Sequence, residues 1–210
     1  VAFEHYTRHA SPDGGADHGP LAAAKAPDHD HREQQHQLIQ REHLRRDRAV
    51  ELGVKRADHA RTPLTVVVSA FSGVTDALLG MARQAAAGDE AYVARAEALR
   101  EQHRAAAGEL CGELGGELAA GLAAMHADLV KLLQGAALLR EASAQTLDQV
   151  ASFGERNSAF IIAHAMGAAG LPAQFLDARG VIRTDAHFGA AHVDVEATDA
   201  AVVAHYAAHP

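Results

Sequence analysis

The sequence has a single cysteine, Cys111, so it cannot form an intramolecular disulfide, which fits a reducing cytosol. It has no excess of basic residues, because its formal net charge is −8, and this argues against a basic surface for nucleic acid or anionic membranes. No apolar run approaches the roughly 18 residues of a membrane-spanning helix, and the N-terminus lacks the basic-then-apolar order of a signal peptide. We therefore expect a cytoplasmic protein that contacts neither nucleic acid nor membrane.

The N-terminal part of the chain is mostly polar, and residues 1–61 hold 8 of the 15 histidines. Mixed charge and low apolar content predict a disordered, His-rich arm over residues 1–36, followed by an uncertain helix and linker over residues 37–61. Two of the histidines, His29 and His31, lie close together, with His36 nearby. A metal site needs three or four converging ligands, so we expect only adventitious metal affinity there and no metal site. A divergent leader and a mistranslated upstream stretch are both open as origins of this segment.

The rest of the chain alternates between strand-like and helix-like patterns, which predicts an α/β domain over residues 62–210. A β-branched run at residues 64–68 is typical of a strand buried on both faces. Two further strands are predicted in "LPAQFLDA" and "GVIRT". Three strands are fewer than the ~5–6 of a usual sheet, so we expect a partial sheet that stops at Pro210. Apolar spacing predicts helices at residues 77–87, 92–107, 117–141, 153–169 and 195–209.

Local signals in these helices predict their packing and their ends. Ser143 is expected to cap the helix that follows it, and Gly170 to close the helix before it. Cys111 lies in an apolar helical stretch without a histidine partner, so we expect a buried, inert thiol. Apolar side chains at three- and four-residue steps predict a core-facing stripe made of Leu118, Leu122, Met125, Leu129, Leu132 and Leu133.

The first candidate for chemistry is "SAFSGVT", which follows the predicted strand at residues 64–68. Ligands of open α/β sheets gather at the carboxyl ends of strands. Hydroxyls of Ser69, Ser72 and Thr75 surround Gly73, and the N-terminus of the next helix offers free N–H groups. This arrangement suits a carboxylate or a phosphate, although an ordinary polar turn has the same composition. It is no Walker loop, because G-x-x-x-x-G-K-[ST] is absent.

Two further segments carry polar groups where helices or strands are expected to begin or end. In "SFGER", the helix dipole alone favours Glu155 at a helix start, but a carboxylate held there also suits an ammonium group. Arg156 is interpreted as a structural ion-pair or surface residue. The segment "DARGVIRTDAHFG" ends a predicted strand at Asp177 and has Phe188 as a wall or lid. Its remaining charged and titratable side chains are Arg179, Arg183, Asp185 and His187.

Three longer segments occur in a fixed order: "VVVSAFSGVTDALL", "TLDQVASFGERNSAFIIA" and "FLDARGVIRTDAHFGAAHVD". Together they resemble the aspartate kinase family of the amino acid kinase fold, over about residues 62–210. They look most like the kinase half of bifunctional aspartate kinase–homoserine dehydrogenases. The resemblance implies an α/β, amino acid kinase-like three-layer α/β/α sandwich, here partial and with a large helical insertion.

The resemblance also implies an activity and a set of site residues. Family members transfer the γ-phosphoryl group of Mg-ATP to the side-chain carboxylate of L-aspartate, giving 4-phospho-L-aspartate for lysine, threonine and methionine synthesis. Carried over by motif, Ser69 and Thr75 would line the aspartate site, Glu155 would hold the substrate's α-ammonium group, and Phe188 would form a further wall. The parent enzyme is expected to be a homo-oligomer.

The sequence departs from the family pattern on the nucleotide side. The lysine-bearing "KFGGTS" segment does not occur in residues 1–61, and the "GRGGSD" and "TDVPG" segments do not occur before Pro210. Sites for ATP and Mg²⁺ are therefore largely missing, catalytic residues stay unassigned, and we expect this chain alone to be inactive. Alternatives are a non-catalytic interaction or regulatory module, an amino acid kinase acting on glutamate or acetylglutamate, and metal binding through the His-rich arm.

Overall fold

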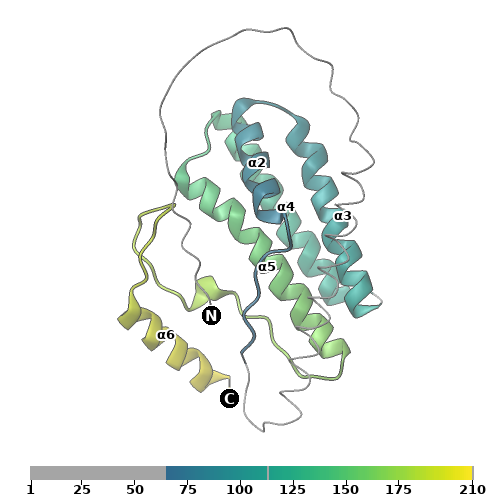
Figure 1. Cartoon of the computed structure of the whole chain (residues 1–210), viewed down its shortest axis with the longest axis vertical. Helices are drawn as coiled ribbons and strands as arrows, with labels where there is room; N and C mark the ends of the chain where they lie inside the picture. Colours follow the sequence, from purple (N-terminus) through teal and green to yellow (C-terminus); the bar gives the residue numbers. More distant parts are fainter. Residues whose placement is uncertain (1–64, 113, 210) are drawn as a thin grey trace. The chain divides into compact units, whose positions relative to one another are not determined.

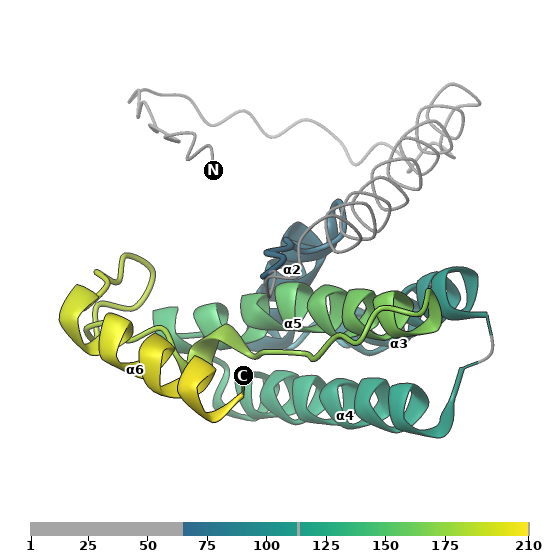
Figure 2. The same cartoon turned by 90° about the horizontal axis from the view of Figure 1, so that it is seen from below.

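The structure is a computed structural model that describes residues 65–112 and 114–209, all of which belong to one structural unit. Four long helices form a bundle in which each helix contacts the other three (Figure 1). They are α2 (Val74–Ala87), α3 (Ala91–Cys111), α4 (Gly116–Leu139) and α5 (Ala144–Ala168). Figure 2 shows α4 running alongside α3 and α5. The predicted arm, helix and linker of residues 1–61 lie outside the described residues.

A short 3-10 turn, η1 (Ala178–Gly180), and a last helix, α6 (Val195–Ala208), follow the bundle. Asp194 caps α6 by accepting a hydrogen bond from the N–H of Ala197, at 2.9 Å. The hydroxyl groups of Tyr206 on α6 and Thr65 form a hydrogen bond with each other. The end of the described chain is therefore tied to its beginning.

The core of the bundle comes from the apolar spacing of the helices, as predicted. Five members of the expected α4 stripe are buried, and Leu132 is partly buried. Fully burying a side chain of this size stabilises the folded state by about 1.5–3 kcal/mol. The largest fully buried apolar side chains come from α2, α4 and α5, and they are Leu78, Met81, Leu133, Ile161, Val74 and Val150.

Several helix ends follow the predicted local signals. Ser143 caps α5, since its hydroxyl accepts a hydrogen bond from the N–H of Thr146 at 3.2 Å. Gly170 has φ +84 and closes α5: its N–H bonds the carbonyl of Gly167, and the N–H of Leu171 bonds that of Met166, both at 3.0 Å. This pair of hydrogen bonds is a Schellman motif, which favours glycine at the left-handed position.

The end of α2 is held by an arginine from a distant part of the chain. Arg140 follows α4 in the left-handed conformation, with φ 54, and its Nη1 donates to the carbonyl oxygen of Ala87 at 2.9 Å. The guanidinium group lies on Gly88, where an added Cβ would come within 1.6 Å of Nη1. A positive charge at a helix C-terminus is favourable because the carbonyl groups there lack partners.

The predicted strands are absent from the part of the chain that the structure describes. Residues 65–70 and 171–177 have no strand pairing, and the region of the third predicted strand contains one antiparallel bridge, Thr184 to Val193. A strand is held by hydrogen bonds to a neighbour, and no such neighbour lies beside these segments among the described residues. The described residues are therefore mostly helical, and they do not confirm the α/β/α sandwich.

The prediction for the start of α5 is wrong. The helix begins at Ala144 rather than at residue 153, so "SFGER" lies inside the helix and not at its mouth. A glycine inside a helix lowers the stability of the helix by about 1 kcal/mol relative to alanine, so Gly154 indicates a helix boundary when the sequence is considered alone. Burial of Val150, Phe153 and Ile161 on one face offsets this cost.

One helix meets the length and composition of a membrane span, contrary to the expectation from the sequence. The apolar window in α4 has a mean hydropathy of 1.3. In the bundle, however, α4 packs against three other helices through its leucine stripe. A core helix of a helical bundle has the same composition.

Candidate functional site

The site predicted from the sequence begins where α5 crosses the start of α2. Gly154 is buried there, and a Cβ added to it would lie 2.8 Å from the Cβ of Ala70 and 3.5 Å from a methyl group of Val74. Only a residue without a side chain allows such an approach. The main chain of α5 at Gly154, next to Glu155 in the sequence, is therefore held close to the segment that carries Ser69 and to the first turn of α2.

A single hydroxyl joins two of the predicted site residues. Ser158 is buried on α5, and its Oγ lies 2.8 Å from the carbonyl oxygen of Ser69 and 2.9 Å from that of Glu155. A hydroxyl has one proton, which these two acceptors share. Ser69 and Glu155, 86 positions apart in the sequence, are thus neighbours in space. Ser158 is not among the residues predicted from the sequence; its signal is a small polar residue in a buried helical position.

The third predicted residue, Thr75, lies in the first turn of α2. This helix begins after Gly73, which has φ 71 and offers no side-chain cap. The N–H of Val74 bonds the carbonyl of Phe71 at 3.0 Å. Within the described residues, no hydrogen bond takes up the next N–H groups, those of Thr75 and Asp76. The positive end of the helix dipole is therefore open to a carboxylate or a phosphate.

Glu155 itself is exposed, and its carboxylate makes no hydrogen bond or ion pair with the residues that the structure describes. It can therefore accept hydrogen bonds from a ligand. Its position inside a helix, rather than at a helix mouth, means that the dipole of α5 does not explain it.

Phe188 is not brought together with these three residues by any contact among the described ones. It is 46% exposed and lies in the loop between η1 and α6. This loop is joined to α5 by a hydrogen bond in which the N–H of Gly189 donates to Oδ2 of Asp148 at 2.6 Å. Asp148 precedes Glu155 by two turns of the helix. The role of Phe188 as a wall therefore stays a prediction.

Arg156 makes the structural ion pair that was expected of it. Its Nε lies 3.1 Å from Oδ2 of Asp177, and its guanidinium carbon lies 4.7 Å from the ring centre of Phe153. The Nε–H bond is not directed at that oxygen, so the contact is an ion pair rather than a hydrogen bond. Hydrogen bonds from Arg179 lower the pKa of Asp177, and the charge of Arg156 lowers it further. This cluster fixes the segment before η1 onto α5.

The sequence predicts a buried thiol at Cys111, but in the structure this thiol is only half-buried. Its Sγ lies 3.9 Å from the carbonyl oxygen of Ile161, and burial raises its pKa. A raised pKa reduces the thiolate fraction, which agrees with the expected low reactivity.

The described residues offer no unpaired lysine for the γ-phosphate of Mg-ATP. The γ-phosphate of such a nucleotide calls for a preorganised cation. The single lysine in the described ranges, Lys131, is exposed on α4 and paired with Asp128 at 2.9 Å. We therefore derive no phosphoryl transfer step from these residues.

Comparison with known proteins shows similarity to aspartokinases. The chain is 35% identical over 120 residues to bifunctional aspartokinase/homoserine dehydrogenase 2, chloroplastic, of Arabidopsis thaliana. Its structure matches that of E. coli aspartokinase III in complex with aspartate and ADP (R-state), with a TM-score of 0.66 and 22% identity. No protein-family model matches the chain.

Both similarities cover only part of the proteins compared. The first spans 56% of this chain and 13% of the Arabidopsis protein, and the second spans 77% of this chain and 34% of aspartokinase III. The resemblance to aspartate kinases that the sequence motifs indicated is confirmed. The chain is aspartate kinase-like, and its fold is that of part of an aspartokinase.

Proposed function

We propose that this aspartate kinase-like chain binds L-aspartate at the junction of α2 and α5. In this proposal it corresponds to the substrate-binding part of an enzyme that phosphorylates the aspartate side chain with ATP, in the synthesis of lysine, threonine and methionine. The proposed binding residues are Ser69, Thr75 and Glu155, with Phe188 as a further wall.

Each proposed residue has a distinct chemical task. Glu155 accepts hydrogen bonds from the α-ammonium group of aspartate, because its carboxylate is exposed and not otherwise paired among the described residues. The open N-terminus of α2 attracts a carboxylate of the same ligand. The hydroxyls of Ser69 and Thr75 donate to carboxylate oxygens and fix their orientation.

The observation that carries the proposal is the position of Ser158. Its hydroxyl is within hydrogen-bond distance of the main chain of both Ser69 and Glu155. The main chains of the residue proposed to bind the ammonium group and of one residue proposed to bind a carboxylate are therefore adjacent, which supports one shared site for an amino acid. The aspartokinase III structure was solved with aspartate and ADP, which supports the same class of ligand.

We propose further that this chain alone does not turn over ATP. The single lysine of the described residues, Lys131, is paired with Asp128, and losing one preorganised cation for the transferred phosphate can cost a factor of about 10²–10³ in rate. ATP and Mg²⁺ are assigned to the parent enzyme, together with its homo-oligomeric state. A cytoplasmic location stays a prediction, since the Arabidopsis protein is named as chloroplastic.

Calorimetric titration of the full chain with L-aspartate tests the binding proposal. We expect heat that saturates with L-aspartate and at most weak heat with L-glutamate. Glu155→Gln removes the charge from the hydrogen bonds to the ammonium group. A hydrogen bond to a charged group contributes about 1.5–3 kcal/mol, so affinity should fall about 10- to 100-fold. Glu141→Gln, at an exposed position after α4, is the matched control and should bind as the parent does.

Three results would contradict the proposal. They are no heat with L-aspartate, equal affinity of the parent and Glu155→Gln, and preference for glutamate, which would favour another amino acid kinase. A coupled assay for ADP tests the second claim separately, and aspartate-dependent turnover by the isolated chain would overturn it. The alternative of a non-catalytic interaction module has no better support.

A further inference from the structure

The loop between η1 and α6 is closed at its base. The N–H of Asp185 donates to the carbonyl of His192 at 3.0 Å, and the N–H of Asp194 donates to that of Arg183 at 2.9 Å. The N–H of Arg183 in turn donates to the hydroxyl of Thr198, a buried residue of α6, at 2.9 Å. Residues 185–192 therefore form a loop whose two ends are fixed to each other and to α6.

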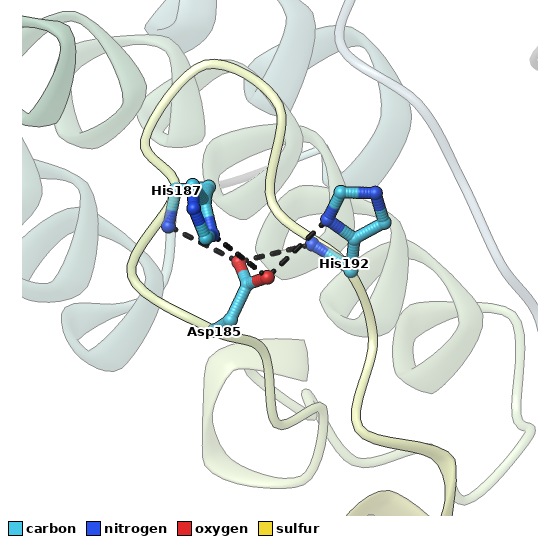
Figure 3. Close-up of side chains that lie close together, drawn as sticks. All are labelled: Asp185, His187 and His192. Atoms are coloured by element: carbon cyan, nitrogen blue, oxygen red, sulfur yellow. Dashed lines mark hydrogen bonds and ion pairs between the residues drawn. The ribbon is translucent and has the colours of Figure 1, made fainter.

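The carboxylate of Asp185 has a fixed orientation in this loop. Its Oδ1 accepts hydrogen bonds from the main-chain N–H groups of His187 and His192, both at 3.1 Å. Its other oxygen, Oδ2, is turned toward the two imidazole rings and lies 3.0 Å from Nδ1 of His187 and 3.2 Å from Nδ1 of His192 (Figure 3). One oxygen thus orients the group, and the second faces two nitrogen atoms.

We propose that Asp185, His187 and His192 form a binding site for a divalent transition-metal ion, with Zn²⁺ as the best fit. One potential ligand atom from each residue lies within 4.8 Å of the other two. Around zinc, ligands at about 2.0–2.1 Å in a tetrahedral shell are separated by roughly 3.3 Å. The observed separations of Oδ2 from the two Nδ1 atoms are close to that value.

The ligand types restrict the metal. Two imidazole nitrogens and one carboxylate oxygen suit zinc, copper, nickel, cobalt or iron, whereas Mg²⁺ and Ca²⁺ prefer oxygen ligands alone. The side chains of His187 and His192 are 77% and 83% exposed, so the remaining coordination positions face water. The site is therefore open and exchangeable, unlike a closed structural zinc site with four protein ligands.

The loop has a competing arrangement without metal, in which the imidazole rings pair directly with the carboxylate of Asp185. The two arrangements use the same nitrogen atoms, so a measurement of metal binding is needed to distinguish them. Phe188 and Gly189 lie between the ligands in the sequence, and a bound ion would hold this part of the loop in one conformation. The proposal stands on the loop alone and does not depend on aspartate binding.

Zinc titration of the full chain tests the proposal, with zinc chloride as the probe after treatment with a chelator. All proteins carry His29→Ala, His31→Ala and His36→Ala, which removes the three clustered histidines expected to bind metal adventitiously. The site variant adds His187→Ala and His192→Ala. The matched control adds His205→Ala and His209→Ala instead, because these imidazoles on and just after α6 are stacked with ring centres 4.4 Å apart.

We expect one equivalent of bound zinc to be lost from the site variant and retained by the control. Because His187 and His192 are exposed, thermal unfolding of the metal-free proteins should be the same. As a second readout, substoichiometric Co²⁺ should broaden the imidazole NMR signals of these two histidines before any others. The proposal is overturned if the site variant takes up as much zinc as its parent. It is also overturned if the parent takes up no zinc, or if only the control loses zinc.

Discussion

Gly154 on α5 lies directly against Ala70, so that a Cβ at position 154 would come 2.8 Å from the Cβ of Ala70. The same Cβ would lie 3.5 Å from side-chain atoms of Val74 and Leu78, which are fully buried. The missing side chain is therefore what allows α5 to approach the segment before α2. This contact sets the distance between the two parts of the proposed aspartate site.

Replacing Gly154 by alanine should destabilise the protein by about 1–3 kcal/mol, because the added methyl group overpacks a core contact. Gly135→Ala in α4 is the control, since an added Cβ meets nothing within 4 Å there and alanine favours a helix by up to about 1 kcal/mol. Urea unfolding followed by circular dichroism measures both. Equal midpoints for Gly154→Ala and the parent would contradict the close approach.

Ser158→Ala should lower the free energy of unfolding by about 1 kcal/mol, because the hydroxyl bonds the carbonyl of Ser69 on a distant segment. Ser152→Ala is the matched control on the same helix. Among the described residues, its hydroxyl bonds only the carbonyl of Gln149 in its own helix, at 2.7 Å, so its loss should change stability by less than about 0.5 kcal/mol. If both variants lose the same stability, Ser158 does not join the two segments.

Removing the cap of α5 should also have a measurable cost. Ser143→Ala leaves the N–H of Thr146 without its acceptor, which should destabilise the protein by about 0.5–2 kcal/mol. Ser143→Asp keeps an acceptor and adds a favourable charge at the helix N-terminus, so it should retain the stability of the parent. Thermal unfolding compares the three proteins, and a stable alanine variant would argue against this cap.

The stability of the protein should depend on the ionisation of Asp177. Hydrogen bonds from Arg179 and the charge of Arg156 place its folded-state pKa below the unfolded value of about 3.9. Its contribution is therefore present above about pH 4 and is lost as the pH falls through the folded-state pKa. Asp177→Asn should be less stable than the parent at pH 6, and the difference should shrink below about pH 4.

Unfolding free energies of both proteins between pH 2 and pH 7 measure this dependence. Arg179→Gln removes the main hydrogen-bond donor, so the difference between the aspartate and asparagine forms should be smaller in that background. A difference that stays constant over the whole pH range would show that Asp177 acts through packing and not through its charge.

The helices and several of their ends, although not the start of α5, were predictable because their signals are local. The spacing of leucine in α4, the hydroxyl of Ser143 and the conformational freedom of Gly170 each act within a few residues. The interpretation of Arg156 as an ion-pair residue was also correct. Its acidic partner, Asp177, was not predicted, because the pair joins positions 21 residues apart.

The strands and the shape of the site were not predictable in the same way. A β-branched run indicates a strand only where a neighbouring strand completes its hydrogen bonds, and residues 65–70 have none among the described residues. Gly154 was read as a helix boundary because its packing partner, Ala70, lies far away in the sequence. Ser158 and the cluster around Asp185 become visible only when the chain is folded.

The contact of Arg140 with Gly88 has a consequence for the evolution of this protein. Any side chain at position 88 would occupy the volume of the guanidinium group and would also have to adopt φ +75. A mutation of Gly88 becomes tolerable only after Arg140 has been lost, and Arg140 can bond the end of α2 only while residue 88 is glycine. In a collection of related sequences, substitutions at these two positions should therefore occur together, although 51 residues separate them.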